Sequence, residues 1–288
     1  MNAPAHGAAR LIVNADDLGW SRGINEGIFH AHRHGIVTSA TLVANMPAAE
    51  AALAVLKEVP NLGVGVHLNA CQGRPLSPGG AGVLAGRDGV MASTAGGMIL
   101  RCALRPRRMR RAIAEEFDAQ VRWCLDAGLK PTHLDTHRHL HYGVPFVFAI
   151  VRDLCRRYDI PHVRRLRERL PRELMATAPP KQRRISRLAS LQDWWTRRRA
   201  GSLFATEGTF GIAHTGLMDA PLLLRMIEHL PPGTTELMVH PGYAEDLDPL
   251  QTRLLGQRRR EVEALCDPRV RDALAARGVE LVHYGQLR

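Results

Sequence analysis

The segment Leu11-Ile-Val-Asn-Ala-Asp-Asp-Leu-Gly19 joins a run of apolar residues to two adjacent carboxylates and a glycine. Such a run predicts a buried strand that ends in polar side chains. Residues of helical period follow over 23–34, and a second apolar run begins at Ile36. This strand, helix, strand order predicts a parallel sheet, because parallel neighbours need a crossover connection between them.

The same alternation continues to the end of the chain. The expected strands are 11–16, 36–43, 62–68, 132–137, 162–166, 236–240 and 279–284. The expected helices are 23–34, 48–58, 109–127, 145–158, 220–229 and 250–265. About seven parallel strands favour an α/β barrel over an open sheet, and barrels place their active sites at the carboxyl ends of the strands. The glycine-rich stretch 79–97 is expected to form a surface loop or lid.

Length and composition restrict the class of protein. The chain has 288 residues, 45% of them apolar, which is enough for a full core. No unbroken apolar run reaches the roughly 18 residues of a spanning helix, and residues 1–10 lack the apolar centre of a secretion signal. Five scattered cysteines without a CxxC pair favour a reducing compartment. We therefore expect a cytoplasmic protein, with peripheral contact at the inner membrane face as an option.

Positive charge gathers in two segments. The chain carries 39 Lys and Arg against 28 Asp and Glu, for a formal net charge of +11, and arginines cluster over 101–111 and 152–199. Positive charge of this kind suggests nucleic acid as a binding partner. No nucleic-acid module is recognisable, however, and an aromatic content of 5% offers few stacking platforms. No GxGxxG or P-loop pattern follows the first strand either, so neither nucleic acid nor nucleotide binding is expected.

The basic stretch 181–199 allows two interpretations. Its arginines alternate with apolar residues such as Ile185, Leu188 and Trp194. An amphipathic helix of this kind can lie on an anionic membrane. It can equally pack against the barrel and leave a solvated arginine face.

Three strand ends carry residues capable of chemistry. Asp16 and Asp17 follow a strand that should be buried, where unpaired carboxylates are costly. A cation or a catalytic proton would compensate them; a capping role before Ser21 is the plainer alternative. His67 ends the strand 62–68, and His240 ends the strand 236–240. Each histidine could instead be a hydrogen-bonded core residue.

A fourth segment is rich in histidine: Thr132-His-Leu-Asp-Thr-His-Arg-His-Leu-His141. If the backbone is extended, the period of two puts Asp135, His137, His139 and His141 on one face. A solvated surface strand is the alternative. One carboxylate and two imidazoles from three strand ends can form an N,N,O metal site with open positions.

These residues resemble the YdjC-like carbohydrate deacetylases. The resemblance is carried, in order along nearly the whole chain, by segments 11–19, 35–42, 65–68, 131–141 and 236–242. Within it, Phe210-Gly-Ile-Ala-His-Thr-Gly-Leu-Met218 and the Leu-Pro-Pro-Gly turn at 230–233 are similar to the hopanoid-biosynthesis branch. Members of that branch are thought to deacetylate a lipid-linked N-acetylglucosamine.

The resemblance implies a single domain over 1–288 with a distorted (β/α) barrel of the glycoside hydrolase/deacetylase type, often a homodimer. It treats 164–200 as an arginine-rich insertion outside the family motifs. It implies one divalent metal ion held by Asp17, His67 and His137, magnesium in the family. Two nitrogen ligands suit zinc better, since magnesium prefers oxygen.

Two positions depart from the family pattern. Leu18 stands where the family usually has phenylalanine, and Arg138 stands where it has a histidine. Neither change removes an implied ligand, and Arg138 is expected to alter the sugar pocket.

The hypothesis that follows is a metal-dependent hydrolase that removes acetyl from an N-acetylated amino sugar, free or lipid-linked. Asp16 would act as the general base and His240 as the acid that protonates the leaving amine. Both aspartates can face the site only if the backbone turns, for which Gly19 is suited. Candidates to orient ligands or contact the sugar are Asp135, Arg138, His139 and His141. The alternative is a metal-dependent barrel hydrolase acting on a phosphoester or a non-sugar amide.

Overall fold

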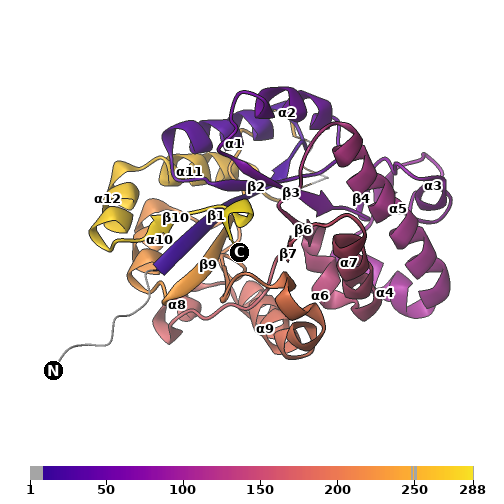
Figure 1. Cartoon of the computed structure of the whole chain (residues 1–288). Coiled ribbons are helices and arrows are strands. Elements are labelled where there is room, and N and C mark those ends of the chain that lie inside the picture. The colour runs from indigo at the N-terminus through magenta and orange to yellow at the C-terminus, as the bar shows by residue number, and fades with distance from the viewer. Residues whose placement is uncertain (1–8, 248, 250–251, 288) are drawn as a thin grey trace.

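The computed structural model describes residues 9–247, 249 and 252–287 (Figure 1). Residues 1–8 and Leu250, the expected start of the helix 250–265, lie outside the described residues. The strands are β1 (Ala9–Leu18), β2 (Ser39–Leu42), β3 (Gly63–Leu68), β4 (Gln72–Gly73), β5 (Met91–Ala92), β6 (His133–Thr136), β7 (His162–Val163), β8 (Gly208–Phe210), β9 (Gly233–Val239) and β10 (Glu280–Leu281).

Helices connect these strands. They are α1 (Arg22–His34), α2 (Ala49–Leu56), α3 (Pro78–Val83), α4 (Ala95–Leu104), α5 (Pro106–Asp126), α6 (Leu140–Gly143), α7 (Pro145–Arg157), α8 (Arg172–Thr177), α9 (Pro180–Ala200), α10 (Ala220–Glu228), α11 (Gly256–Leu265) and α12 (Pro268–Ala276). Three single turns of 3-10 helix are η1 (His137–His139), η2 (Gly201–Leu203) and η3 (Tyr284–Gln286).

Seven parallel strands form one curled sheet in the order β7-β6-β3-β2-β1-β9-β8, and β10 pairs with the start of β1. Figure 1 shows helices surrounding this sheet. The chain after β7 runs beside β8, where the amide of Thr209 donates to the Arg167 carbonyl at 3.0 Å. This contact brings the two edge strands together, so the expected distorted barrel is confirmed.

Strand β1 lies inside the sheet between β2 and β9, and its residues 11–18 are all buried. Strands of a parallel sheet are covered on both faces, which explains the continuous apolar run from Leu11 to Val13. Helix α1 begins at Ser21, whose hydroxyl accepts from the Ile24 amide, and it buries Ile24 and Ile28 against the sheet. The capped start of α1 therefore fixes the backbone turn between Asp17 and Ser21.

Several expected elements differ from the observed ones. The strand at 132–137 ends at Thr136, because Arg138 and His139 adopt left-handed φ angles of 58° and 55°. The expected strands 36–43, 162–166 and 279–284 are shorter in the structure. Strand β8 was not expected. The stretch 79–97 is not a plain loop, since it contains most of α3, strand β5 and the start of α4.

The arginine-rich segment 164–200 divides into two parts. Its first residues run through the barrel wall, and the rest forms α8 and α9 on the outside (Figure 1). Within the described residues, no helix is both long enough and apolar enough to span a bilayer.

Candidate metal centre and active site

Two adjacent carboxylates at the end of β1 face the same site because the backbone reverses between them. Asp17 has a φ of 72°, and Gly19 follows at 87°. The register between β1 and β2 shifts over the same residues. A positive φ is uncommon for any residue but glycine and often marks a functional position. The expected turn is therefore present, although Asp17 itself begins it.

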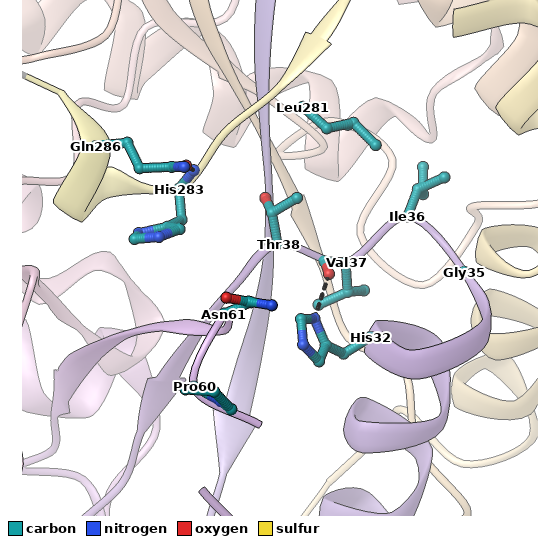
Figure 2. A pocket seen from close by; sticks show the side chains of 10 residues that line it. All are labelled: His32, Gly35, Ile36, Val37, Thr38, Pro60, Asn61, Leu281, His283 and Gln286. Atoms are coloured by element: carbon teal, nitrogen blue, oxygen red, sulfur yellow. Dashed lines mark hydrogen bonds between the residues drawn. The ribbon is translucent and has the colours of Figure 1, made fainter. Parts of the chain in front are cut away.

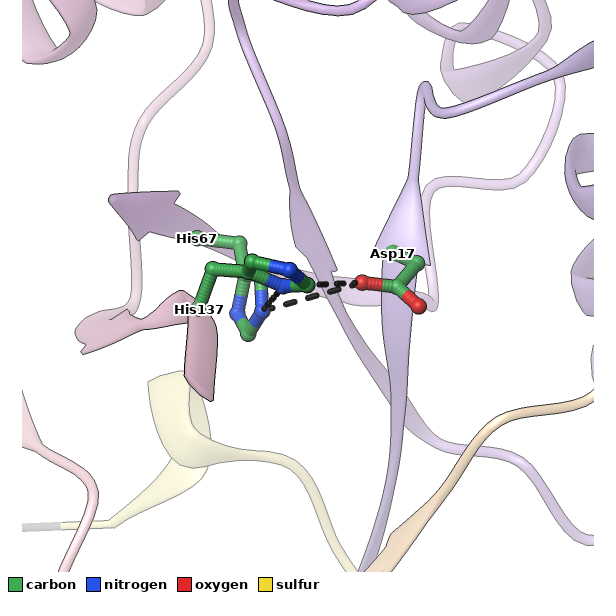
Figure 3. Close-up of side chains that lie close together, drawn as sticks. All are labelled: Asp17, His67 and His137. Atoms are coloured by element: carbon green, nitrogen blue, oxygen red, sulfur yellow. Dashed lines mark hydrogen bonds and ion pairs between the residues drawn. The ribbon is translucent and has the colours of Figure 1, made fainter. Parts of the chain in front are cut away.

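Asp17, His67 and His137 come together at the carboxyl edge of the sheet (Figure 3). The Oδ1 atom of Asp17 lies 3.8 Å from His67 Nε2 and 3.5 Å from His137 Nδ1. The two ring nitrogens are 3.3 Å apart. Each of the three residues thus offers one ligand atom to a common point, although Asp17 and His137 are 120 positions apart in the sequence.

Hydrogen bonds at the far side of each ring orient the two imidazoles. His67 Nδ1 lies 2.6 Å from Asp135 Oδ1, and His137 Nε2 lies 3.0 Å from Gln72 Oε1. An acceptor at one ring nitrogen fixes the proton there and leaves the lone pair on the other. His67 Nε2 and His137 Nδ1 can therefore both act as metal ligands. Gln72 was not among the expected site residues.

The charges of the site also fit a cation. Four buried carboxylates, from Asp16, Asp17, Asp135 and Glu236, surround two buried guanidiniums, from Arg164 and Arg258. Asp17 Oδ2 binds Arg258 at 2.6 Å, whereas its buried Oδ1 has no hydrogen-bond donor among the described residues. Excess buried negative charge is costly unless it is compensated. The residues present therefore fit a divalent ion.

The same charges act on the ligand His67. Burial lowers the pKa of this imidazole, but the carboxylates of Asp135, Asp16 and Asp17 together outweigh burial and raise the pKa to about 9. The surrounding carboxylates thus stabilise a positive charge next to His67, either as a proton on the ring or as a metal ion bound to it.

Arg164 connects the carboxylates to one another. Its fully buried guanidinium binds both oxygens of Asp16, at 2.6 and 2.7 Å, and reaches Asp135 at 2.5 Å and Glu236 at 2.8 Å. Burial raises the pKa of Asp16, but Arg164 and then His67 outweigh it, and the net pKa is lowered. Sequence reasoning missed Arg164 because it counted this residue with the arginine-rich segment. Its place directly after the short apolar run of β7 was the available signal.

His240 stands next to Asp16 with its ring in a nearly buried position. Its Nε2 lies 3.9 Å from Asp16 Oδ2. Burial lowers the pKa of His240 to about 4, although the two aspartates oppose this shift. The imidazole is therefore neutral at neutral pH and can accept a proton from a strong donor.

The loop after β6 places its three remaining candidates differently. Arg138 donates to Gln72 Oε1 at 2.8 Å, so it supports the residue that orients His137. His139 is partly exposed, and burial together with Arg164 holds its pKa well below the ordinary value. His141 is fully buried and bonded to Thr136. The expectation that a period of two places all four polar groups on one face is wrong, because the strand ends at Thr136.

A cavity of about 370 Å³ lies at the other end of the sheet (Figure 2). It is lined by residues that precede β2 and β3, including His32, Thr38 and Asn61, together with His283. None of the described residues that line it carries a carboxylate. Since parallel barrels gather their catalytic groups at the carboxyl ends of strands, this cavity is not the candidate active site.

Comparison with known proteins agrees with the geometry of the site. The chain matches the family model described as YdjC-like protein over residues 10–276. It is 34% identical over 274 residues to the carbohydrate deacetylase of Geobacillus stearothermophilus, covering 95% of this chain and 96% of that one. It is 30% identical over 284 residues to the chitooligosaccharide deacetylase of Proteus mirabilis, covering 96% and 98%.

A solved structure from Enterococcus faecalis V583, described provisionally as a cellobiose-phosphate cleavage protein, has the same fold. It superposes with a TM-score of 0.76 at 22% identity, over 96% of this chain and 98% of that one. With the family model covering most of the sequence and its strand-end residues meeting as described, the chain belongs to the YdjC-like family.

Proposed function

We propose that this protein is a metal-dependent deacetylase that hydrolyses the acetamide of an N-acetylated amino sugar and releases acetate. The sugar is of the N-acetylglucosamine type, as an oligosaccharide or a glycolipid. The carrying observation is the convergence of Asp17 Oδ1, His67 Nε2 and His137 Nδ1 beside an ionised Asp16. The names of the related proteins, which are carbohydrate and chitooligosaccharide deacetylases, supply the substrate class.

Asp17, His67 and His137 would hold the metal ion. When bound there, a divalent ion supplies Lewis-acid stabilisation of the oxyanion that develops on the acetamide carbonyl. Two nitrogen donors and one oxygen donor favour zinc or a similar transition metal over magnesium.

Asp16 takes the proton of the attacking water. Arg164 keeps this carboxylate ionised and fixed through two hydrogen bonds, so it is available as an acceptor when the water oxygen bonds to the carbonyl carbon. Its lowered pKa means that the proton is held only briefly. The proton therefore needs a nearby acceptor of higher basicity.

His240 is that acceptor. It is neutral before the reaction and lies 3.9 Å from Asp16. A proton relayed from Asp16 to His240 then passes to the amine nitrogen as the carbon–nitrogen bond breaks. The products are acetate and the free amino sugar, and both side chains return to their starting states. His139 and Arg138 line the partly exposed side of this site and are proposed to contact the sugar.

Mass spectrometry of candidate substrates tests the proposal. Diacetylchitobiose and a lipid-linked N-acetylglucosamine should each be incubated with the protein after reconstitution with zinc or with magnesium. The expected result is the loss of one acetyl group with one equivalent of acetate. Phosphate release from a generic phosphoester, or hydrolysis confined to a non-sugar amide, would contradict the proposal and support another barrel hydrolase.

A further inference from the structure

Helix α9 packs on the barrel by its polar side. The residues that it buries are Ser186, Ala189, Asp193, Thr196 and Ala200. Asp193 binds the Arg165 guanidinium at 2.8 Å and accepts from the Tyr142 hydroxyl at 3.3 Å. A helix on a globular surface normally buries its apolar stripe instead. The attachment of α9 thus combines these polar contacts with Ala189, Ala200 and Trp195, which packs against Phe148. Its other large apolar residues are left for another contact.

These other large apolar residues of α9 face solvent. Exposed fractions are 43% for Ile185, 52% for Leu188, 72% for Leu191 and 68% for Trp194. At 100° per residue, Leu188, Leu191 and Trp194 lie on the side of the helix opposite its buried residues, and Ile185 lies at the border of the buried side. The helix packs on the barrel and leaves its arginines in solvent, as the second interpretation of 181–199 expects, and its outward side also carries apolar residues.

Helix α4 carries a second group of exposed apolar residues. Ile99, Leu100 and Leu104 are 40%, 59% and 71% exposed. Across the described part of the chain, seven of the nine large apolar side chains that are exposed belong to α4 and α9. Helix α6 contacts both helices and lies between them in Figure 1. We call the exposed parts of α4 and α9, with the arginines that flank them, the basic apolar face.

The positive charge of the chain is concentrated on the same two segments. Segments 95–111 and 181–199 hold thirteen of the 39 Lys and Arg, more than the whole net charge of +11. Their one acidic residue, Asp193, is buried in the ion pair with Arg165. The guanidinium of Arg198 lies 4.0 Å from the centre of the Trp194 ring. Apolar side chains and cations are thus interleaved, and no exposed carboxylate in these segments neutralises them.

A groove of about 240 Å³ beside Leu104 is lined by both apolar and positively charged side chains. Val83, Leu104 and Met109 form its apolar lining, and Arg101, Arg105 and Arg108 supply three guanidiniums. This combination fits an anionic headgroup with the first part of an acyl chain attached.

We propose that the basic apolar face docks this protein onto an anionic lipid bilayer. Leu188, Leu191 and Trp194 insert at the level of the headgroups, with α9 lying in the plane of the membrane. The flanking arginines bind lipid phosphates, each contributing on the order of 1 kcal/mol near an anionic surface. The inference concerns a surface away from the catalytic residues and does not rest on the deacetylase proposal.

Charge complementarity selects the bilayer over the other occupants. In a two-fold contact with a second copy, arginine-rich segments would face each other without exposed carboxylates to pair with. A nucleic acid would satisfy the arginines but would leave Leu104 and Leu191, both more than 70% exposed, without an apolar partner. An anionic membrane accepts the cations and the aliphatic side chains together.

Vesicle co-sedimentation of the full chain tests the proposal. The probes are vesicles of phosphatidylcholine alone and of phosphatidylcholine with one third phosphatidylglycerol, at low and at physiological salt. We expect binding to the anionic vesicles that weakens as salt screens the charges, and little binding to the neutral ones. Equal binding to both, or to neither, would overturn the proposal.

Two variants separate the contributions of the face. Leu188→Gln with Leu191→Gln and Trp194→Gln should lower the vesicle partition coefficient by a factor on the order of 10 to 100, as the lost apolar contact implies. Arg184→Gln with Arg187→Gln and Arg198→Gln should lower it by a factor on the order of 100. Circular dichroism and thermal melting verify that each variant is folded. Activity on a soluble sugar should be unchanged, because none of these residues touches the site.

Matched controls use exposed residues elsewhere. Arg22→Gln with Arg253→Gln and Arg260→Gln removes the same charge around α1 and α11, and Leu76→Gln with Leu217→Gln removes exposed apolar residues outside the face. Both should retain vesicle binding. A control that loses binding as strongly as its test variant overturns the proposal. The proposal is also overturned if the apolar variant changes the oligomeric state and leaves vesicle binding intact. It is overturned as well if the wild-type protein retards a nucleic acid in a gel and does not bind vesicles.

Discussion

Asp135 Oδ1 lies 2.6 Å from His67 Nδ1, and this contact directs the other nitrogen of the ring toward Asp17. The carboxylate thus orients a proposed metal ligand. Groups in this position typically change metal affinity by factors of about 10 to 100.

Replacing Asp135 by asparagine should therefore weaken metal binding by about 10-fold to 100-fold. The amide keeps the shape of the carboxylate but loses the charge that favours a fixed ring proton. Competition titration against a chromogenic chelator measures the affinity. Asp153→Asn, an exposed exchange of the same kind, should leave it unchanged. Unaltered affinity in D135N would show that His67 is oriented by other contacts.

Asp16→Asn should abolish turnover while metal content stays intact. The asparagine cannot accept the water proton, and loss of a general base commonly costs about 10² to 10⁴ in rate. Acetate release and elemental analysis on the same sample measure the two quantities. If the metal were lost instead, the division of roles between Asp16 and Asp17 would be wrong.

Removing the metal should lower stability as well as activity. An ion that binds only the folded chain adds about 2.7 kcal/mol at a free concentration one hundred times its Kd. Without it, the carboxylates around Asp17 regain their mutual repulsion. Dialysis against a chelator should lower the Tm measured by calorimetry, and adding zinc should restore it. A Tm that changes neither with the chelator nor with added zinc would argue against a metal ion at this site.

Arg164→Met should destabilise the fold. It leaves three buried carboxylates without their shared cation, and breaking a buried ion pair from one side costs about 3 to 5 kcal/mol. Urea unfolding measures the loss. Arg157→Met is the matched control, because its pair with Asp118 is exposed to water and should matter little. Equal unfolding midpoints for the two variants would refute the proposed role of Arg164.

Glu261 gives the expected pH dependence of stability. Burial raises the pKa of this carboxyl to about 7, against an ordinary 4.5. A raised pKa means that the folded state binds the proton more tightly, so stability is full below pH 4.5 and falls as pH rises to about 7. Glu261→Gln should remove this loss, since an amide still accepts from the His240 backbone amide. Melting curves at pH 5 and pH 8.5 should show a gain confined to the higher pH.

The sequence predicts the positions of Asp16, Asp17, His67 and His240 well, because each ends an apolar run and parallel strands share one carboxyl edge. It fails between His137 and His141, where two consecutive left-handed residues cannot be inferred from residue type. It also fails for Arg164, whose partner Asp16 lies 148 positions away. A contact of that range depends on how the sheet curls, which local patterns do not encode.

The outward side of α9 was left open for a similar reason. Apolar residues at helical spacing indicate a face, and they do not say whether the barrel or another partner covers it. The buried pair of Arg165 with Asp193 settles the orientation here, and no periodicity argument identifies such a pair in advance.

Because the backbone at Asp17 is left-handed, a substitution there must meet two separate requirements: it must tolerate a positive φ, and it must supply a negatively charged oxygen. Glutamate, the usual substitute for aspartate, suits the chemistry but not the φ of 72°, while glycine suits the backbone and brings no oxygen. Asparagine satisfies the shape and forfeits the negative charge. Saturation of codon 17 should therefore yield folded proteins and functional proteins as two nearly separate sets, and the overlap between them should contain aspartate alone.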